Sequence, residues 1–240
     1  MKRPEVRGLI IRISTLLLLG LGIVITGKLH AARYSYDSTV IPEASIPKLD
    51  KQTYVFLTHY GKELQDMSYE YGVDWRLALA VLRQESAFNP TVISEKGAEG
   101  FMQLMPNTGL YLASLHNVQD ITRPSDNIKL GVIHLRDMLR NFSDTEGDNR
   151  LELAIAAYNC GYSRIEDAQT ISKFLGDPTD SWSSVRSGLT LLSKRFSPLH
   201  AHVWEDGKPT AGYFAGSDET LGYVESVMQF YNIYRNVLRR

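Results

Sequence analysis

The chain has 240 residues, of which 43% are hydrophobic and 22% are charged, and its formal net charge is −1. This composition excludes global disorder and collagen, and it indicates one domain, with or without a tail, that can bury a sizeable core. The near-zero net charge excludes a polybasic nucleic-acid-binding protein. The only cysteine, Cys160, excludes an internal disulfide and a cysteine-rich zinc site.

Residues 1–32 have the pattern of an export segment. Basic residues are frequent in residues 1–12, and the apolar run that follows, residues 13–27, carries no charge. That run is shorter than the roughly 20 apolar residues that a spanning helix needs. Two interpretations are a cleaved signal peptide and an N-terminal anchor that associates with a membrane through residues 8–27. The third, without export, is a buried core helix. Export by either route places the rest of the chain in the periplasm or cell envelope.

The rest of the chain is predicted to be a linker followed by one mainly α domain. Residues 33–50 contain proline, serine and threonine without helical or strand periodicity, which is typical of a linker. Helical periodicity begins near Lys51 and continues, with breaks, towards the end of the chain. We therefore expect the domain to cover residues 51–240.

The second predicted helix brings a carboxylate onto an apolar stripe. Asp74 is expected to cap this helix, apolar residues recur at spacings of three and four up to Glu85, and Asn89-Pro90 ends it. Because such a stripe faces the core, Glu85 is expected to be buried, which raises a carboxyl pKa and suits a general acid. The alternative is that Glu85 lies at the helix end and faces water.

Further elements are predicted from apolar spacing and from turn residues. They are a Gly-rich stretch over 91–100, a short helix from near Pro106 to Leu115, a helix over 127–140 capped by Asp126, a polar loop over 141–149, a buried helix over 151–159, a helical region over 163–195 broken at 176–178, an irregular lobe or small hairpin over 196–217, and a last helix over 218–238.

Two of these segments carry polar groups that suit a sugar-binding groove. Gln103 lies among Met and Leu after the Gly-rich stretch, while Tyr158 and Asn159 lie near the end of a predicted helix. Tyrosine stacks on sugars, and amide groups bond to their hydroxyl and amide groups. The alternatives are a glycine turn that leads into core residues, and a core helix that ends in an Asn-x-Gly cap.

Five blocks occur in a fixed order along the chain. They are Glu85-Ser86-x-Phe88-Asn89-Pro90, Ser94-x-x-Gly97-Ala98-x-Gly100-Phe101-Met102-Gln103-Leu104-Met105-Pro106-x-Thr108, Asn127-Ile128-x-x-Gly131, Ala157-Tyr158-Asn159 and Tyr223-Val224. Together they resemble the catalytic domain of family 1 lytic transglycosylases, the soluble type with a lysozyme-like fold of the α+β superfamily. The resemblance covers about residues 52–236, and its later part is most similar to the catalytic module of the membrane-bound lytic murein transglycosylases F.

The resemblance implies an enzyme that cleaves peptidoglycan with one carboxyl group. Glu85 takes the position of the lone acid/base, which protonates the oxygen between N-acetylmuramic acid and N-acetylglucosamine. It then helps the muramic 6-hydroxyl attack its own anomeric carbon, which gives a 1,6-anhydro end. Since the substrate supplies the nucleophile, the family needs no second catalytic carboxylate.

The resemblance also implies a set of substrate-binding residues. They are Ser94 near the acid, Gln103 and Met105 in the groove, Tyr158 and Asn159 along it, and Tyr223 with a hydrogen bond near Glu85. Peptidoglycan glycan strands are the expected partner of a monomer that binds no nucleic acid, cofactor or metal. The pair His200-x-His202 has no obvious third ligand.

Two departures from the family and two other functions stay open at this point. Cys160 is expected to serve packing, and His134 is expected at a helix surface. A muramidase-type hydrolase of the same fold would need a second carboxylate, for which Asp126 and Glu152 are the candidates. A non-catalytic glycan-binding or assembly protein is the third reading.

Overall fold

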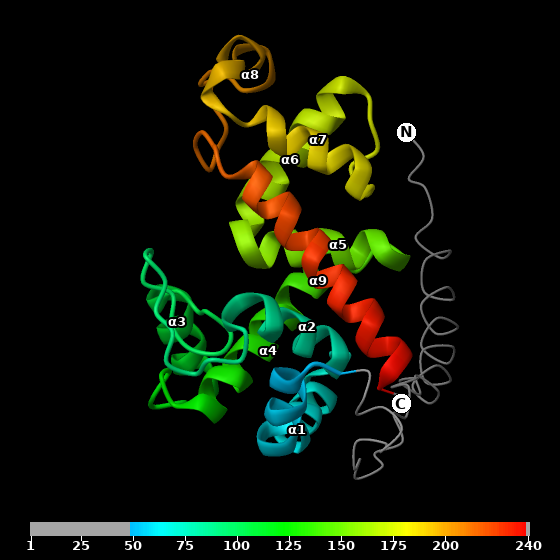
Figure 1. The fold of residues 1–240 in the computed structure, drawn as a ribbon. Helices are drawn as coiled ribbons and strands as arrows, with labels where there is room; N and C mark the ends of the chain where they lie inside the picture. Colours follow the sequence, from blue (N-terminus) through cyan, green and yellow to red (C-terminus); the bar gives the residue numbers. More distant parts are fainter. Residues whose placement is uncertain (1–48, 239–240) are drawn as a thin grey trace, which may run out of the picture. The chain divides into compact units, whose positions relative to one another are not determined.

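The computed structural model describes residues 49–238, so the predicted export segment and nearly all of the predicted linker lie outside the described residues. The last residue of that linker, Asp50, caps the first helix by accepting from the backbone N–H groups of Gln52 and Thr53. The elements are α1 (Lys51–Tyr71), α2 (Trp75–Ser86), α3 (Pro106–His116), α4 (Pro124–Asn141), α5 (Gly147–Cys160), α6 (Tyr162–Leu175), α7 (Trp182–Leu191), the short 3-10 helix η2 (Lys194–Phe196), α8 (Ser197–Val203) and α9 (Ser217–Val237) (Figure 1).

The predicted mainly α class is confirmed for this part of the chain. Its only β pairing consists of isolated bridges, from Ile93 to Glu99 and from Glu99 to Leu104. Between residues 49 and 238, no helix combines the length and the apolar character that crossing a bilayer requires. The predicted anchor over residues 8–27 lies outside that range.

Helix α2 is the buried centre of the domain, and α9 runs along it. Residues 77–82 of α2 are almost completely buried. At the start of α2, Asp74 caps the helix as predicted and accepts a hydrogen bond of 3.0 Å from the Tyr231 hydroxyl of α9. At the other end, Glu85 accepts one of 2.6 Å from the Tyr223 hydroxyl, also of α9. Two tyrosines of one helix therefore hold two carboxyl groups at opposite ends of the other.

The segment between α2 and α3, residues 87–105, is called the Gly-rich segment below, and α4 holds it in place. The Asn127 Oδ1 atom accepts from the Met102 backbone N–H at 2.8 Å, and its Nδ2 donates to the Glu99 carbonyl at 3.0 Å. A side chain on Gly131, one turn further along α4, would overlap the Met102 side chain, and one on Gly100 would meet Asn127. The motif Asn127-Ile128-x-x-Gly131 is therefore the contact between α4 and this segment.

Two predicted boundaries differ from the structure. Helix α4 begins at Pro124 with Arg123 as its N-cap residue, so the predicted cap by Asp126 is wrong. Proline suits the first helical position because it needs no backbone partner there, and Asp126 instead pairs with Arg123 at 2.9 Å from within the first turn. Helix α5 begins at Gly147, so the predicted polar loop over 141–149 ends earlier than expected.

The region 196–217 is partly helical, so the predicted small hairpin is wrong. It contains α8, followed by a loop that is anchored to α6 by a buried carboxylate. Asp167 accepts from the backbone N–H groups of Thr210 and Ala211 at 3.0 and 2.8 Å. This anchor lies 43 residues away in sequence, beyond the reach of local patterns, and it positions the end of the loop beside α9.

The replacement Asn127→Ala tests the contact between α4 and the Gly-rich segment. It leaves the buried Met102 N–H without a partner and removes one of the two donors to the Glu99 carbonyl, which keeps the Leu104 N–H. An unpaired buried group costs about 1–3 kcal/mol. We expect the free energy of unfolding, measured by urea denaturation, to fall by about 1–3 kcal/mol. The matched control Asn141→Ala, at an exposed position of α4, is expected to stay within about 0.5 kcal/mol of the parent. Equal effects of the two changes would contradict this account of the motif.

Candidate active site

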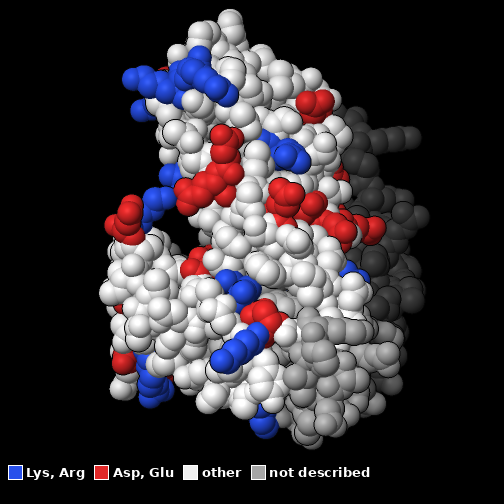
Figure 2. All heavy atoms as spheres, viewed as in Figure 1, with Lys and Arg blue, Asp and Glu red and all other residues white. Residues whose placement is uncertain are grey.

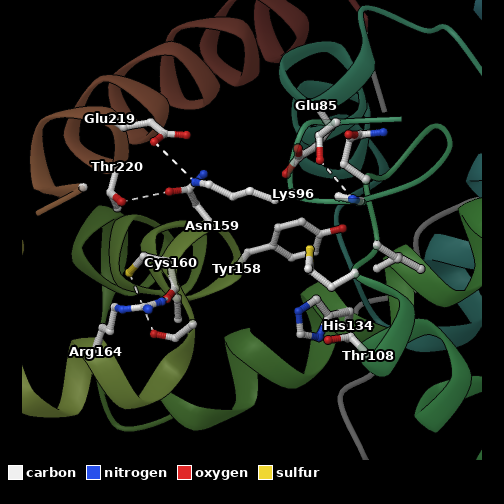
Figure 3. A pocket seen from close by; sticks show the side chains of 18 of the residues that line it. Glu85, Lys96, Thr108, His134, Tyr158, Asn159, Cys160, Arg164, Glu219 and Thr220 are labelled. Carbon is white, nitrogen blue, oxygen red and sulfur yellow. Dashed lines mark hydrogen bonds and ion pairs between the residues drawn. The ribbon is translucent and has the colours of Figure 1, made fainter. Parts of the chain in front are cut away.

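A pocket of about 1020 Å³ lies between the Gly-rich segment, the junction of α5 and α6, and the start of α9. The space-filling view shows this face of the molecule hollowed at its left edge, with basic and acidic side chains at the rim (Figure 2). The close view shows Tyr158 in the middle of the pocket, with Glu85 on one side and Arg164 on the other (Figure 3). A concave site lined by aromatic and amide side chains has the character of a ligand site.

Glu85 occupies the last turn of α2, where its half-buried side chain lines the pocket. Burial raises its pKa from an ordinary value of 4.5 to about 7, and the hydrogen bond from Tyr223 only partly opposes this rise. No Lys, Arg or His of residues 49–238 forms an ion pair with it. The predicted burial of Glu85 is confirmed only in part, because the residue as a whole is half-buried at the wall of the pocket. Near neutral pH the group is available in both protonation states.

Three predicted site residues lie on the Gly-rich segment, and all three line the pocket. The Ser94 Oγ atom accepts from the Ala98 backbone N–H at 2.9 Å and so closes a turn of the segment. The Gln103 amide donates to the carbonyls of Val92 and Gly100, at 3.0 and 2.9 Å. Met105 leaves 43% of its surface exposed. Ser94 and Gln103 therefore hold the shape of the wall, and Met105 offers an apolar contact surface.

Tyr158 and Asn159 come from the end of α5 and also line the pocket. The Tyr158 hydroxyl donates to the Met102 carbonyl at 2.8 Å, which ties α5 to the Gly-rich segment and leaves the ring as a wall. The Asn159 Oδ1 atom accepts from the Thr220 hydroxyl of α9 at 2.8 Å. Both side chains therefore join α5 to an opposite wall.

Tyr223 differs from the other predicted residues because it lies behind Glu85. It is buried, and the pocket lining does not include it. Burial and the neighbouring Glu85 raise the phenol pKa well above its ordinary value, so the hydroxyl stays protonated and donates a hydrogen bond to the carboxyl. Tyr223 therefore reaches the pocket only through Glu85.

His134, which was expected at a helix surface, is half-buried and lines the pocket. Its ring centroid is 4.8 Å from that of Tyr158, and burial lowers its pKa. The sequence carried a signal for this position, because Asn127, Gly131 and His134 follow the i, i+4, i+7 spacing of one helix face.

Other pocket residues had no assigned role in the sequence. At the rim, Lys96 of the Gly-rich segment pairs with Glu219 of α9 at 3.7 Å, and both side chains are exposed. Arg164 enters from the first turn of α6, and Phe214 from the loop that Asp167 anchors. No helical or strand period marks a residue such as Phe214, whose place depends on contacts distant in sequence.

The two residues proposed as a second carboxylate, Asp126 and Glu152, do not line this pocket. Among the described residues, the acidic side chains that do are Glu85, Glu95 and Glu219, the last two being exposed. Glu85 is the least exposed of these three residues, and burial raises its pKa to about 7.

Cys160 and His200, which the sequence also singled out, are both buried. Cys160 is buried, and burial raises its thiol pKa to about 11, which agrees with a packing role. His200 is buried with its Nε2 atom 2.7 Å from the Leu191 carbonyl oxygen. Over residues 49–238, no three His, Cys, Asp or Glu side chains are grouped to hold a metal ion.

Residues 64–178 match the family model described as the transglycosylase SLT domain. The chain contains a transglycosylase SLT domain. Two curated relatives carry the name membrane-bound lytic murein transglycosylase F. The protein from Desulfosudis oleivorans is 32% identical over 204 residues, which are 85% of this chain and 42% of the relative. The protein from Yersinia enterocolitica is 30% identical over 221 residues, which cover 84% of this chain and 43% of the relative. The chain thus spans less than half the length of these relatives.

A solved structure has the same fold as the SLT domain described here. It is the complex of the 70-kDa soluble lytic transglycosylase with bulgecin A, with a TM-score of 0.54 and 22% sequence identity. The match covers 80% of this chain and 26% of that chain. It confirms the predicted lysozyme-like fold class.

The buried carboxyl of Glu85 predicts a pH-dependent stability. Between pH 4.5 and about 7, Glu85 of the folded SLT domain holds a proton that the unfolded chain has released. The free energy of unfolding therefore falls as the pH rises through that window. Above it, the charged carboxyl costs up to about 3 kcal/mol. Glu85→Gln is therefore expected to raise the free energy of unfolding at pH 8 and to change it little at pH 4, as measured by urea denaturation. A gain of the same size at both pH values would count against burial as the cause, and Glu95→Gln, at an exposed position of the pocket, is the control.

Proposed function

We propose that this chain is an exported peptidoglycan lytic transglycosylase with Glu85 as its single acid/base. It cleaves the β-1,4 bond from N-acetylmuramic acid to N-acetylglucosamine and leaves a 1,6-anhydro-N-acetylmuramic acid end. The observation that carries the proposal is the Glu85 carboxyl, which lines a sugar-sized pocket and whose pKa burial raises to about 7. The SLT domain match and the names of the relatives support the reaction class.

Glu85 performs both proton transfers of this reaction. In its protonated form, it donates a proton to the glycosidic oxygen as the bond to the muramic anomeric carbon breaks. The resulting carboxylate accepts the proton of the muramic 6-hydroxyl while that oxygen bonds to the same carbon. Glu85 ends the cycle protonated, and water is not consumed. A pKa near 7 suits this double role because neither protonation state is rare.

The walls of the pocket suit an amide-bearing glycan. Tyr158 and Met105 offer apolar surface to sugar rings, and Gln103 and Asn159 bring amide groups. Tyr223 acts as a positioning residue, because its hydrogen bond orients the Glu85 carboxyl and stabilises its charged form.

The proposed location of the enzyme follows from peptidoglycan as its substrate. Murein lies outside the cytoplasm, and residues 1–32 have the composition of an export segment, either cleaved or retained as an anchor. A monomer in the periplasm or cell envelope, with or without membrane association through residues 8–27, completes the proposal.

Mass spectrometry of digested cell-wall sacculi tests the reaction. The chain is expected to release anhydro-muramyl products, which are lighter by one water than reducing ends. Glu85→Gln is expected to lower their release by about 10²–10⁴-fold, since it removes the acid and the base. Glu95→Gln, which changes an exposed carboxylate of the same pocket, is expected to keep most of the activity. Reducing-end products would instead show a hydrolase, and no products from the parent chain would favour a glycan-binding or assembly protein.

The pH dependence of the rate tests the role of Tyr223. Tyr223→Phe removes a donor that lowers the Glu85 pKa, so the pKa rises further and the alkaline limb of the pH–rate profile is expected to move up by about one unit. Tyr231→Phe is the matched control, since Tyr231 donates from the same helix to Asp74 and is expected to leave the limb in place. A limb that stays unchanged in Tyr223→Phe would contradict the positioning role.

A further inference from the structure

Arg164 is a fixed cation on the side of the pocket opposite Glu85 (Figure 3). Its Nη1 atom donates to the Cys160 carbonyl at the end of α5. Its guanidinium carbon lies 4.8 Å from the centre of the Phe214 ring. These two contacts hold the side chain from both sides, so it presents a rigid fork of N–H donors to the pocket.

Much of the donor capacity of Arg164 is unused within the described chain. Its Nε atom is buried and has no hydrogen-bond partner among residues 49–238. No carboxylate of that range forms an ion pair with it. The other pocket cation, Lys96, is exposed at the rim and already pairs with Glu219. A buried donor without a partner is rare in folded proteins and calls for an explanation.

The start of α6 adds to the positive character of this end of the pocket. Gly161, the N-cap residue, has no side chain that caps the helix, and Gly161 and Tyr162 both line the pocket. The first backbone N–H groups of a helix lack internal partners and carry partial positive charge. Arg164 and this first turn therefore favour the same kind of ligand, an anion with planar oxygen acceptors.

We propose that Arg164, with the first turn of α6, forms a subsite for a carboxylate on the lactyl arm of a muramic acid residue. This inference rests on the proposed function, which makes a peptidoglycan strand the substrate. Muramic acid differs from glucosamine by that arm, which ends in a carboxylate when bare and otherwise continues into a stem peptide with carboxylates of its own. The shared chemistry is a carboxylate, and the subsite sets the register of the strand because N-acetylglucosamine has none.

Binding to the inactive Glu85→Gln chain tests the subsite without turnover. Three strand preparations are compared by titration calorimetry: peptide-bearing strands, peptide-free strands with lactyl carboxylates, and either of them after carbodiimide amidation. Adding Arg164→Met is expected to weaken binding of carboxylate-bearing strands by about tenfold or more. It is expected to leave binding of the amidated strands unchanged. Arg164→Lys, which keeps the charge, is expected to lose less, and Arg186→Met, on the exposed face of α7, is expected to lose nothing.

Each outcome bears on the subsite directly. A loss confined to peptide-bearing strands assigns the carboxylate to the stem peptide, and a loss confined to peptide-free strands assigns it to the lactyl group. Equal affinity with and without Arg164 overturns the proposal, and so does an equal loss for amidated strands, which would show a structural role through Phe214. Failure of the proposed function is visible separately, because the parent chain would then release no 1,6-anhydro ends even if strand binding depended on Arg164.

Discussion

The desolvation of the Glu85 carboxyl beside α9, without a cation that pairs with it, is the constraint on which the site depends. Asp74 and Glu85 stand at the two ends of α2, and each accepts a hydrogen bond from a tyrosine of α9. Burial acts to raise the pKa of both carboxyls. At Asp74, hydrogen bonds and the charge of Arg76 outweigh burial and hold the pKa below its ordinary value. Glu85 has only Tyr223 to oppose burial, so its pKa rises to about 7. One pair of helices thus holds a structural carboxylate and the proposed proton-transfer group, and the arginine beside Asp74 makes the difference between their pKa values.

The rest of the pocket keeps the opposite wall at a fixed place relative to Glu85. The Gly-rich segment has little regular structure of its own, and its shape depends on side chains that bond to its backbone. Asn127 holds it from α4 and Tyr158 from α5, both through the backbone of Met102. The segment, α4 and α5 therefore meet at one residue next to the pocket. This explains why Asn127 and Gly131 of α4 belong to a pattern that otherwise concerns the proposed sugar site.

Much of the fold and of the candidate site follows from sequence, because both depend on local periods and on motifs. Apolar spacing predicts the helices, and the stripe through α2 predicts that Glu85 faces inward, where the structure shows it half-buried at the pocket wall. What local patterns missed depends on contacts distant in sequence. Residue preference pointed to Asp126 as a cap, but Pro124 sets the start of α4. The loop that carries Phe214 is held by Asp167 from α6, which no pattern in residues 196–217 reveals. The unpaired Nε atom of Arg164 is visible only once α6 and that loop are placed together.

The most direct test of the central claim is a titration of the Glu85 carboxyl itself. Infrared difference spectra between the parent chain and Glu85→Gln isolate the C=O stretch of one protonated carboxyl as a function of pH. The account predicts that this band disappears with a midpoint near pH 7, in the chain without substrate. A midpoint near the ordinary glutamate value of 4.5 would show that the carboxyl is solvated and ionised at neutral pH, and it would contradict the assignment of Glu85 as the proton donor.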